Sequence, residues 1–282
     1  METQSLKNKK MNSNYIKIIA LVILVFLGAN SSAQETVTIP LTQPKEKGFL
    51  KIGIINGSIS IQGYKGDEVI VKGIKRVGKS RRKSRSKNGR NGLKRITNSS
   101  LEFSAEEYDN TVHVRSVPQG TTDFEIQVPE NFSLKVSTIN RGDVFIENIN
   151  GTIDVSNTNG KITLKDIKGS VSADALNKDI IVNFLKVTPN VPMAFSSLNG
   201  DIDVTFPSTF KADVKVKSDR GEIFTDFDLK TKPSKANITK DANRKHNAYR
   251  VKVEKWIVGS INGGGPEVLF KNFNGDVIIR SK

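Results

Sequence analysis

The sequence contains no cysteine at any of its 282 positions. This absence excludes disulfide bonds, thiolate metal sites and a lipid-bearing cysteine after a signal peptide. An exported form of this chain is therefore expected to be free in solution or held non-covalently.

Histidine is almost as scarce, because only His113 and His246 occur. His113 lies in an alternating, strand-like segment and His246 in a polar one, so a Ser-His-Asp triad or a histidine-rich metal centre lacks its components. We interpret both as ordinary strand or surface residues. The sequence predicts no catalytic residue, no cofactor and no metal site.

Long hydrophobic runs are also missing, since the apolar run at residues 18–27 is shorter than the roughly 20 residues that span a bilayer. Four lysines precede this run, and small residues ending at Ala33 follow it. That order is typical of a secretory signal peptide, with cleavage before Gln34. We expect residues 1–33 to be this signal and residues 34–282 to be exported to the periplasm, the outer-membrane surface or the medium. An uncleaved membrane anchor is the alternative.

Acidic residues are absent from one stretch, and this local absence explains the net charge of +15. Residues 72–95 contain twelve Lys or Arg and no acid, and residues 1–33 contain four Lys and one Glu. Of the 44 basic and 29 acidic residues, 28 of each remain elsewhere. The chain is otherwise balanced, so nucleic acid is not the expected partner.

The basic stretch (residues 72–95) is predicted to be a loop inserted between strands. No apolar side chain occurs from Lys79 to Arg90, and like charges at this density stay solvated. The loop is either a plain insertion or an electrostatic tether to lipid heads, acidic envelope polysaccharide or nucleic acid, of which envelope polysaccharide is the expected partner of an exported protein. The candidate anion contacts are Arg81, Arg82, Lys83, Arg85, Lys87 and Arg90.

Glycine recurs with a fixed period. Nine residues separate each neighbour among Gly142, Gly151, Gly160 and Gly169, and the unit returns at Gly57, Gly66, Gly200, Gly221 and Gly275. Apolar residues follow most of these glycines at the second and fourth positions, which places them on one face of a strand. Apolar residues also occur two positions before the turn, and we expect them to be buried: Ile55, Ile149, Ile167, Leu176, Leu198 and Phe273.

The period favours a coil over a hairpin. Nine is odd, so the glycine, usually preceded by Asn or Lys, is expected to adopt positive φ, turn a corner and restart the alternation. We predict an all-β, single-stranded, right-handed β-solenoid (β-helix) with short glycine-cornered repeats. A β-sandwich with Asn-Gly hairpins is the alternative, but equal spacing stacks like positions and favours the solenoid.

Three further segments, residues 111–115, 123–129 and 249–258, alternate and are predicted to be strands that flank or cap the coil. Residues 230–247 are predicted to form a polar loop. No segment after residue 33 has a helical period.

The order of several motifs resembles a known family. Phe-Glu-Ile-Gln-Val-Pro at residues 124–129 and Ser-Leu-Lys-Val at 133–136 precede the Gly-x-Ile-x-Val units, and Gly-Gly-Gly-Pro at 263–266 precedes Asn-Gly-Asp-Val-Ile-Ile at 274–279. This resembles the bacterial "putative adhesin" family of exported β-solenoid domains of unknown function, over residues 49–280. The resemblance implies a solenoid, an envelope or external location and a role in surface attachment. It provides no catalytic residues, and the basic stretch departs from its pattern.

Glycine-rich segments can form calcium sites in β-rolls or phosphate-binding loops, and the sequence fits neither pattern. Asp154, Asp166 and Asp174 lie three, six and five positions after their glycines, so they cannot form the ligand ladder of a calcium-binding β-roll. Asp201 and Asp203 share a strand face, as either a solvated surface or a cation site. Residues 263–265 are predicted to form a turn, because they lack the Gly-Lys-Ser/Thr end of a phosphate loop.

These observations favour a non-enzymatic, exported envelope or surface protein, an adhesin whose solenoid surface contacts glycan or protein. A carbohydrate-active enzyme on a β-helix scaffold is one alternative. A structural envelope protein that polymerises end to end is the other, because an uncapped solenoid end is an unpaired strand edge.

Overall fold

The computed structural model describes residues 34–76, 101–117, 120–232, 237–243, 248–254 and 256–282. These residues belong to one compact unit, Ala33–Lys282, and form strands and loops without any helix. Accordingly, no described segment is a helix of the length and apolar character that crossing a bilayer requires. The predicted signal peptide lies outside the described residues.

The strands form two long sheets and one separate hairpin. In spatial order, sheet A contains β1 (Gln34–Pro40), β4 (Glu68–Lys75), β7 (Thr122–Pro129), β3 (Ile59–Tyr64), β9 (Val144–Glu147), β11 (Ile162–Ala175), β12 (Ile180–Val187), β14 (Ile202–Phe206), β22 (Val277–Ser281) and β16 (Ile223–Thr225). Sheet B contains β5 (Phe103–Tyr108), β6 (Thr111–Ser116), β2 (Phe49–Asn56), β8 (Ser133–Asn140), β10 (Thr152–Asn157), the second half of β11, β13 (Met193–Asn199), β21 (Glu267–Asn274), β15 (Ala212–Ser218), β20 (Ile257–Ile261) and β17 (Lys230–Lys232). The hairpin pairs β18 (Asn237–Asn243) with β19 (Ala248–Glu254).

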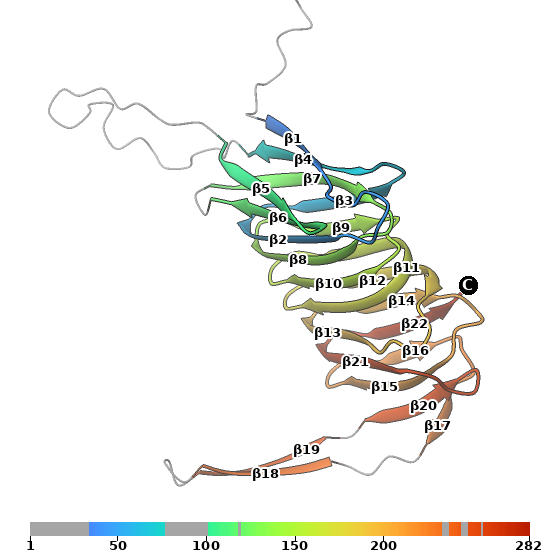
Figure 1. Cartoon of the computed structure of the whole chain (residues 1–282). Helices are drawn as coiled ribbons and strands as arrows, with labels where there is room; N and C mark the ends of the chain where they lie inside the picture. Colours follow the sequence, from blue (N-terminus) through green and yellow to red (C-terminus); the bar gives the residue numbers. More distant parts are fainter. Residues whose placement is uncertain (1–33, 77–100, 118–119, 233–236, 244–247, 255) are drawn as a thin grey trace, which may run out of the picture. The chain divides into compact units, whose positions relative to one another are not determined.

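Consecutive strands form coils, each with one strand in sheet B and the next in sheet A. Val144 pairs in parallel with Ile162, and Ile162 pairs with Ile180, so a coil takes 18 residues, or two nine-residue units. Figure 1 shows the strands of successive coils lying one above another. The described chain is therefore a β-solenoid-like stack, as predicted. Its two sheets face each other as in a sandwich, but strands inside the stack are parallel, and antiparallel pairs occur at its ends and in the hairpin.

The coils are not stacked in chain order. The coil β2–β3 lies between β6–β7 and β8–β9, although it precedes both in the sequence. The coil β21–β22 likewise lies between β13–β14 and β15–β16, although it follows both. The first and last coils of the chain are therefore inserted one layer inside the stack.

The core lies between the sheets and is built from rows of aliphatic and aromatic side chains. Ile59, Val144, Ile162, Ile180 and Ile202 form one such row, each with no exposed surface. Burial of each such side chain is worth roughly 1.5–3 kcal/mol, so repetition of the row over many coils is the main source of stability.

The prediction of positive φ at the repeated glycines is correct at Gly57, Gly200 and Gly275 but wrong at the four evenly spaced ones. Gly142, Gly151, Gly160 and Gly169 do not have positive φ; at each of them a Cβ atom would clash with the backbone of the neighbouring coil. Positive φ occurs instead at other positions, including Asn148 (57°), and at some later glycines such as Gly200 (146°). These four glycines are therefore required by the close approach of the coils.

The prediction that apolar residues are buried on both sides of every corner is wrong in part. Ile149 and Ile167 are buried, but four of the six residues are exposed: Ile55, Leu176, Leu198 and Phe273. The left-handed residues Asn148 and Asp166 (φ 57° and 54°) reset the alternation and turn the following isoleucine inward. No such residue stands before the exposed four, so alternation along the strand carries them outward.

Three other expectations also change. Strands β6 and β7 form a complete coil rather than a flank, and the predicted polar loop at residues 230–247 contains β17 and β18. Residues 72–75, the first of the basic stretch, belong to β4, so the insertion begins later than predicted.

Candidate binding surface at the glycine corner

We call the edge where sheet B strands end and sheet A strands begin the glycine corner. Several backbone carbonyl groups at this corner accept a hydrogen bond from a polar side chain of the adjacent coil. Thr138 Oγ1 donates to Gly57 O at 3.1 Å, Asn157 Nδ2 to Gly142 O at 3.1 Å, and Asn272 Nδ2 to Gly200 O at 2.9 Å. No buried side-chain nitrogen or oxygen of the described residues lacks a partner. These hydrogen bonds hold the backbone of the glycine corner in one conformation.

An amide ladder runs along the outside of this corner. It consists, in spatial order, of Asn140, Asn159, Asn177, Asn199 and Asn274. Each asparagine after Asn140 donates from its Nδ2 to the Oδ1 of the asparagine before it in this order, at 2.7 to 3.0 Å. Ladders of stacked amides stabilise cross-β assemblies in the same way. The ladder holds neighbouring coils in register.

A row of acidic side chains follows directly after the corner. Each accepts a backbone N–H of the next coil, as Asp143 Oδ1 does from Lys161 N (2.8 Å) and Asp201 Oδ1 from Asp276 N (2.9 Å). Asp203 instead accepts two hydrogen bonds from Arg280, which raise the pKa of that guanidinium together with the charge of the carboxylate. The described part of the chain holds no cluster of three or more His, Cys, Asp or Glu suited to a metal ion. Both Asp201 and Asp203 accept hydrogen bonds from residues of the neighbouring coil.

The exposed apolar side chains beside the ladder form a row that is interrupted once, by Thr158. We define the apolar row as five residues on the outer face of sheet B, each between 37% and 45% exposed: Ile55, Ile139, Leu176, Leu198 and Phe273. The pairing of β2, β8, β10, β11, β13 and β21 brings these positions into register, with Thr158 between Ile139 and Leu176. Coils are about 4.8 Å apart, so the row presents regularly spaced apolar groups.

A depression of about 370 Å³ adjoins one end of the apolar row. Leu176, Leu198 and Phe273 line it together with charged residues of both signs: Lys217, Lys271, Asp174 and Asp219. Lys217 is paired with Asp219 at 3.0 Å. The guanidinium of Arg220 lies 5.0 Å from the centroid of the Phe273 ring, a cation–π contact. Val117 and Ile55 line a second depression, of about 210 Å³, at the other end. Apolar side chains flanked by amides and by charged groups of both signs can bind an extended, polar molecule with apolar faces.

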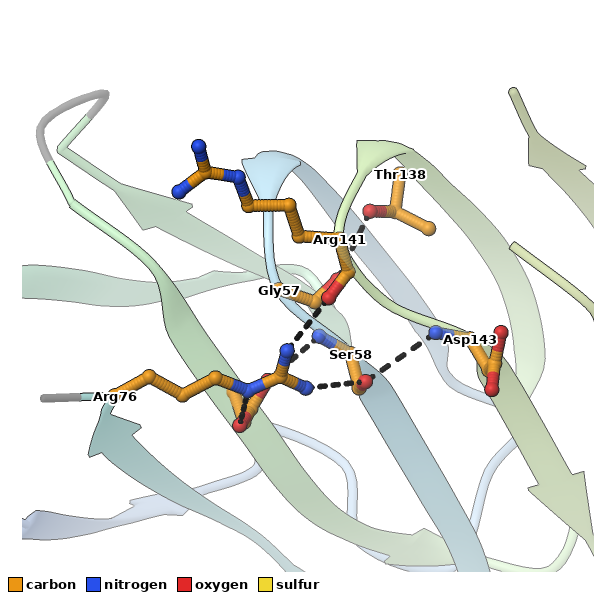
Figure 2. A network of polar contacts seen from close by, with 7 residues as sticks. Gly57, Ser58, Arg76, Thr138, Arg141 and Asp143 are labelled. Carbon is orange, nitrogen blue, oxygen red and sulfur yellow. Dashed lines mark hydrogen bonds and ion pairs between the residues drawn. The ribbon is translucent and has the colours of Figure 1, made fainter. Parts of the chain in front are cut away.

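The strand that leads into the basic stretch is fixed at the same corner. Figure 2 shows Arg76, directly after β4, reaching across Ser58, while the side chain of Arg141 points away. Arg76 donates to Asp123 Oδ2 (2.5 Å), to Arg141 O (2.6 Å) and to Ser58 Oγ (2.9 Å). The candidate anion contacts Arg81, Arg82, Lys83, Arg85, Lys87 and Arg90 lie outside the described residues. The structure therefore positions only the base of this stretch.

Three sequence features remain: the two histidines and the glycine run at residues 263–265. His113 is half-buried on β6, in register with Lys51, and His246 lies outside the described residues. A turn was predicted at residues 263–265, and the structure has one at residues 262–263, directly after β20. The amide ladder and the apolar row were not predicted as a surface. Their signal was the Asn before the corner and the apolar residue before that Asn.

A family model described as Toastrack DUF4097 matches residues 3–255. The chain belongs to the Toastrack DUF4097 family. This confirms the family resemblance inferred from the sequence motifs. No curated protein is significantly similar to this Toastrack DUF4097 chain.

Two solved structures resemble this Toastrack DUF4097 chain. One is described as a "putative cell adhesion protein" from Clostridium sporogenes; it is 14% identical, covers 89% of this chain and 100% of its own, and has a TM-score of 0.45. The other is described as a "putative adhesin" from Bacteroides fragilis; it is 14% identical, covers 89% of this chain and 98% of its own, and has a TM-score of 0.32.

Proposed function

We propose that this chain is a non-enzymatic, exported protein of the cell envelope that binds glycan or protein along the apolar row. The observation that carries this proposal is the row itself: five exposed apolar side chains, in register beside a ladder of hydrogen-bonded amides. Apolar and aromatic side chains at such exposure bind partners, and the amides supply donors and acceptors for polar groups.

Three ionisable side chains of the described residues have structural roles. Hydrogen bonds from Thr42 lower the pKa of Glu107, and Glu147 raises that of Lys165. Asp203 raises the pKa of Arg280 through two hydrogen bonds and its charge. These contacts hold segments of the stack together, which supports a stable binding surface.

The proposal has three further parts: export of the chain, a right-handed winding of the coils and a binding role for the basic stretch. We infer that residues 1–33 are a cleaved signal peptide and that the basic stretch adds electrostatic contact with anionic envelope polymers, through Arg81, Arg82, Lys83, Arg85, Lys87 and Arg90. The coils are taken to wind right-handed, because crossovers between parallel strands almost always do. Antiparallel strands β1 and β4 cover one end of sheet A, which favours a capped stack over end-to-end polymerisation.

The test measures binding of the exported chain to bacterial glycans and envelope proteins at two salt concentrations. The double substitution Leu176→Ser/Leu198→Ser is expected to weaken binding about tenfold, because two apolar contacts are lost. The matched control is Phe145→Ser/Phe224→Ser, which removes side chains of similar exposure from sheet A and should leave binding unchanged.

Two outcomes would contradict parts of the proposal. Equal binding by the Leu176/Leu198 variant and the unmodified chain would remove the apolar row from the function. Release of sugar fragments from any bound glycan would replace binding with catalysis. A variant with the six basic candidates changed to Gln should lose salt-sensitive binding to anionic polymers, whereas unchanged binding would make the stretch a plain insertion.

A further inference from the structure

A third depression lies at the opposite corner, where sheet A strands end and sheet B strands begin. Its volume is about 420 Å³, within the range of small-molecule sites. Three connections line it: the end of β12 with residues 188–190, residues 207–211 between β14 and β15, and residues 264–266 before β21. No residue of the apolar row takes part.

The depression exists because the regular corner is interrupted here. Ile162 pairs with Ile180 in sheet A, and Ser172 pairs with Ala194 in sheet B. The chain takes ten residues to pass from Ile162 to Ser172, but 14 residues to pass from Ile180 to Ala194 in the next coil. The four extra residues lie in the proline-containing connection between β12 and β13. This longer connection replaces the tight glycine turn found in the preceding coils.

An aromatic stack forms the floor. Phe210 lines the depression and stacks on Phe206 with ring centroids 4.1 Å apart, and Phe206 stacks on Phe184 at 5.1 Å. Phe184 and Phe206 are fully buried, while Phe210 keeps a small exposed face. This stack holds Phe210 in place, and Leu185 and Pro266 add further apolar lining.

Hydrogen bonds fix the walls relative to one another. Asn262 has positive φ and donates from Nδ2 to both Ser208 O and Phe210 O, each at 2.8 Å. Asp213 N donates to Pro266 O at 3.2 Å, which ties residues 264–266 to the start of β15. The site is formed before any ligand arrives, so binding costs little ordering.

Two lysines contribute to the lining of this depression. Lys186, near the end of β12, and Lys211, just before β15, both line the depression. Neither ammonium group has an ion pair or hydrogen bond with any residue that the structure describes. Unpaired lysines beside an apolar surface complement an anionic ligand with an apolar body.

We propose that this depression binds a small amphiphilic anion, with an apolar body on Phe210 and Leu185 and a carboxylate or phosphate at Lys186 and Lys211. The two lysines attract the anion, and the apolar floor supplies most of the affinity. The site is independent of the binding proposed for the apolar row, and the two can be lost separately.

The experiment titrates the purified protein with octanoate, octyl phosphate and octanol by calorimetry. Octanoate and octyl phosphate should bind more tightly than octanol, and the tighter of the two identifies the preferred anionic group. In Lys186→Gln/Lys211→Gln, octanoate affinity should fall about tenfold, whereas octanol affinity should not change. In Leu185→Ser, the affinity for all three ligands should fall.

The matched control is Lys45→Gln/Lys51→Gln, which removes the same charge from exposed positions outside the depression and should change octanoate affinity less than about twofold. If both double substitutions weakened octanoate binding equally, the effect would come from the net charge of the protein, and the proposed site would be wrong. Octanoate binding that survives both Lys186→Gln/Lys211→Gln and Leu185→Ser, or no binding to the unmodified protein, would also overturn it. Unchanged melting temperatures exclude loss of the fold as the cause.

Discussion

At the scale of single residues, the spacing between coils depends on glycines that tolerate no side chain. A Cβ atom at Gly160 would overlap the carbonyl of Gly142 in the coil below, and neither backbone can move without breaking the parallel pairing. Gly160→Ala is therefore expected to lower the free energy of unfolding by about 3 kcal/mol, measured by chemical denaturation. Gly120→Ala is the control, because its Cβ would meet no atom within 4 Å and positive φ alone costs about 1 kcal/mol. A smaller loss at Gly160 than at Gly120 would contradict close approach as the reason for these glycines.

Glu107 gives a residue-scale prediction about pH. Hydrogen bonds from the hydroxyl and backbone N–H of Thr42 and from Asn110 N favour its charged form and lower its pKa below 4.5. A carboxyl with a lowered folded-state pKa stabilises the fold above its unfolded pKa, and this contribution disappears as pH falls through the folded value. Hydrogen exchange at Thr42 N should accelerate as pH drops below about 4.5, after correction for the intrinsic rate. In Glu107→Gln this extra acceleration should vanish, and its persistence would assign the effect to another group.

At the scale of elements, the amide ladder links five neighbouring coils through side chains alone. Asn177 both donates to Asn159 and accepts from Asn199, whereas Asn140 at the ladder's end only accepts. Asn177→Ala should therefore lower the free energy of unfolding by about 2 kcal/mol and Asn140→Ala by about half as much, since each hydrogen bond contributes roughly 1 kcal/mol. Denaturant titration of both variants tests this ratio. Equal losses would mean that the ladder bonds do not determine the cost.

The elements also show which features were readable in the sequence. The half-coil period and the inward positions after each glycine were predicted correctly, because glycine spacing and strand alternation are local signals. The apolar row was not predicted, because Ile149 and Leu176 occupy equivalent positions in the sequence, two residues before a corner, although only Ile149 is buried. Only the left-handed conformation of Asn148, which the contacts of its coil impose, separates the buried residue from the exposed one. The depression at Lys186 was visible only as a break in the period.

At the scale of the whole molecule, the insertion of the first and last coils is the feature no local pattern could predict. Leu50 pairs with both Val112 and Leu134, and Val268 pairs with both Met193 and Val214, so each of these strands is held between segments distant in the sequence. A simple solenoid can lose its terminal repeats one by one, because each repeat contacts only its neighbours. Here the chain's own first and last coils cannot leave without opening a gap inside the stack.

Hydrogen exchange followed by mass spectrometry tests this arrangement. Amides of β2–β3 and of β21–β22 should exchange within about tenfold of those in β10–β12 at the centre, because their release requires opening of the surrounding coils. The antiparallel strand β1, which pairs on one side with β4, should exchange much faster. Fast exchange of β21 and β22 together with slow exchange of β13 and β14 would show that the last coil detaches alone. That result would contradict the inserted order, whereas uniform protection would make the stack a single cooperative unit that keeps the apolar row straight while a partner is bound.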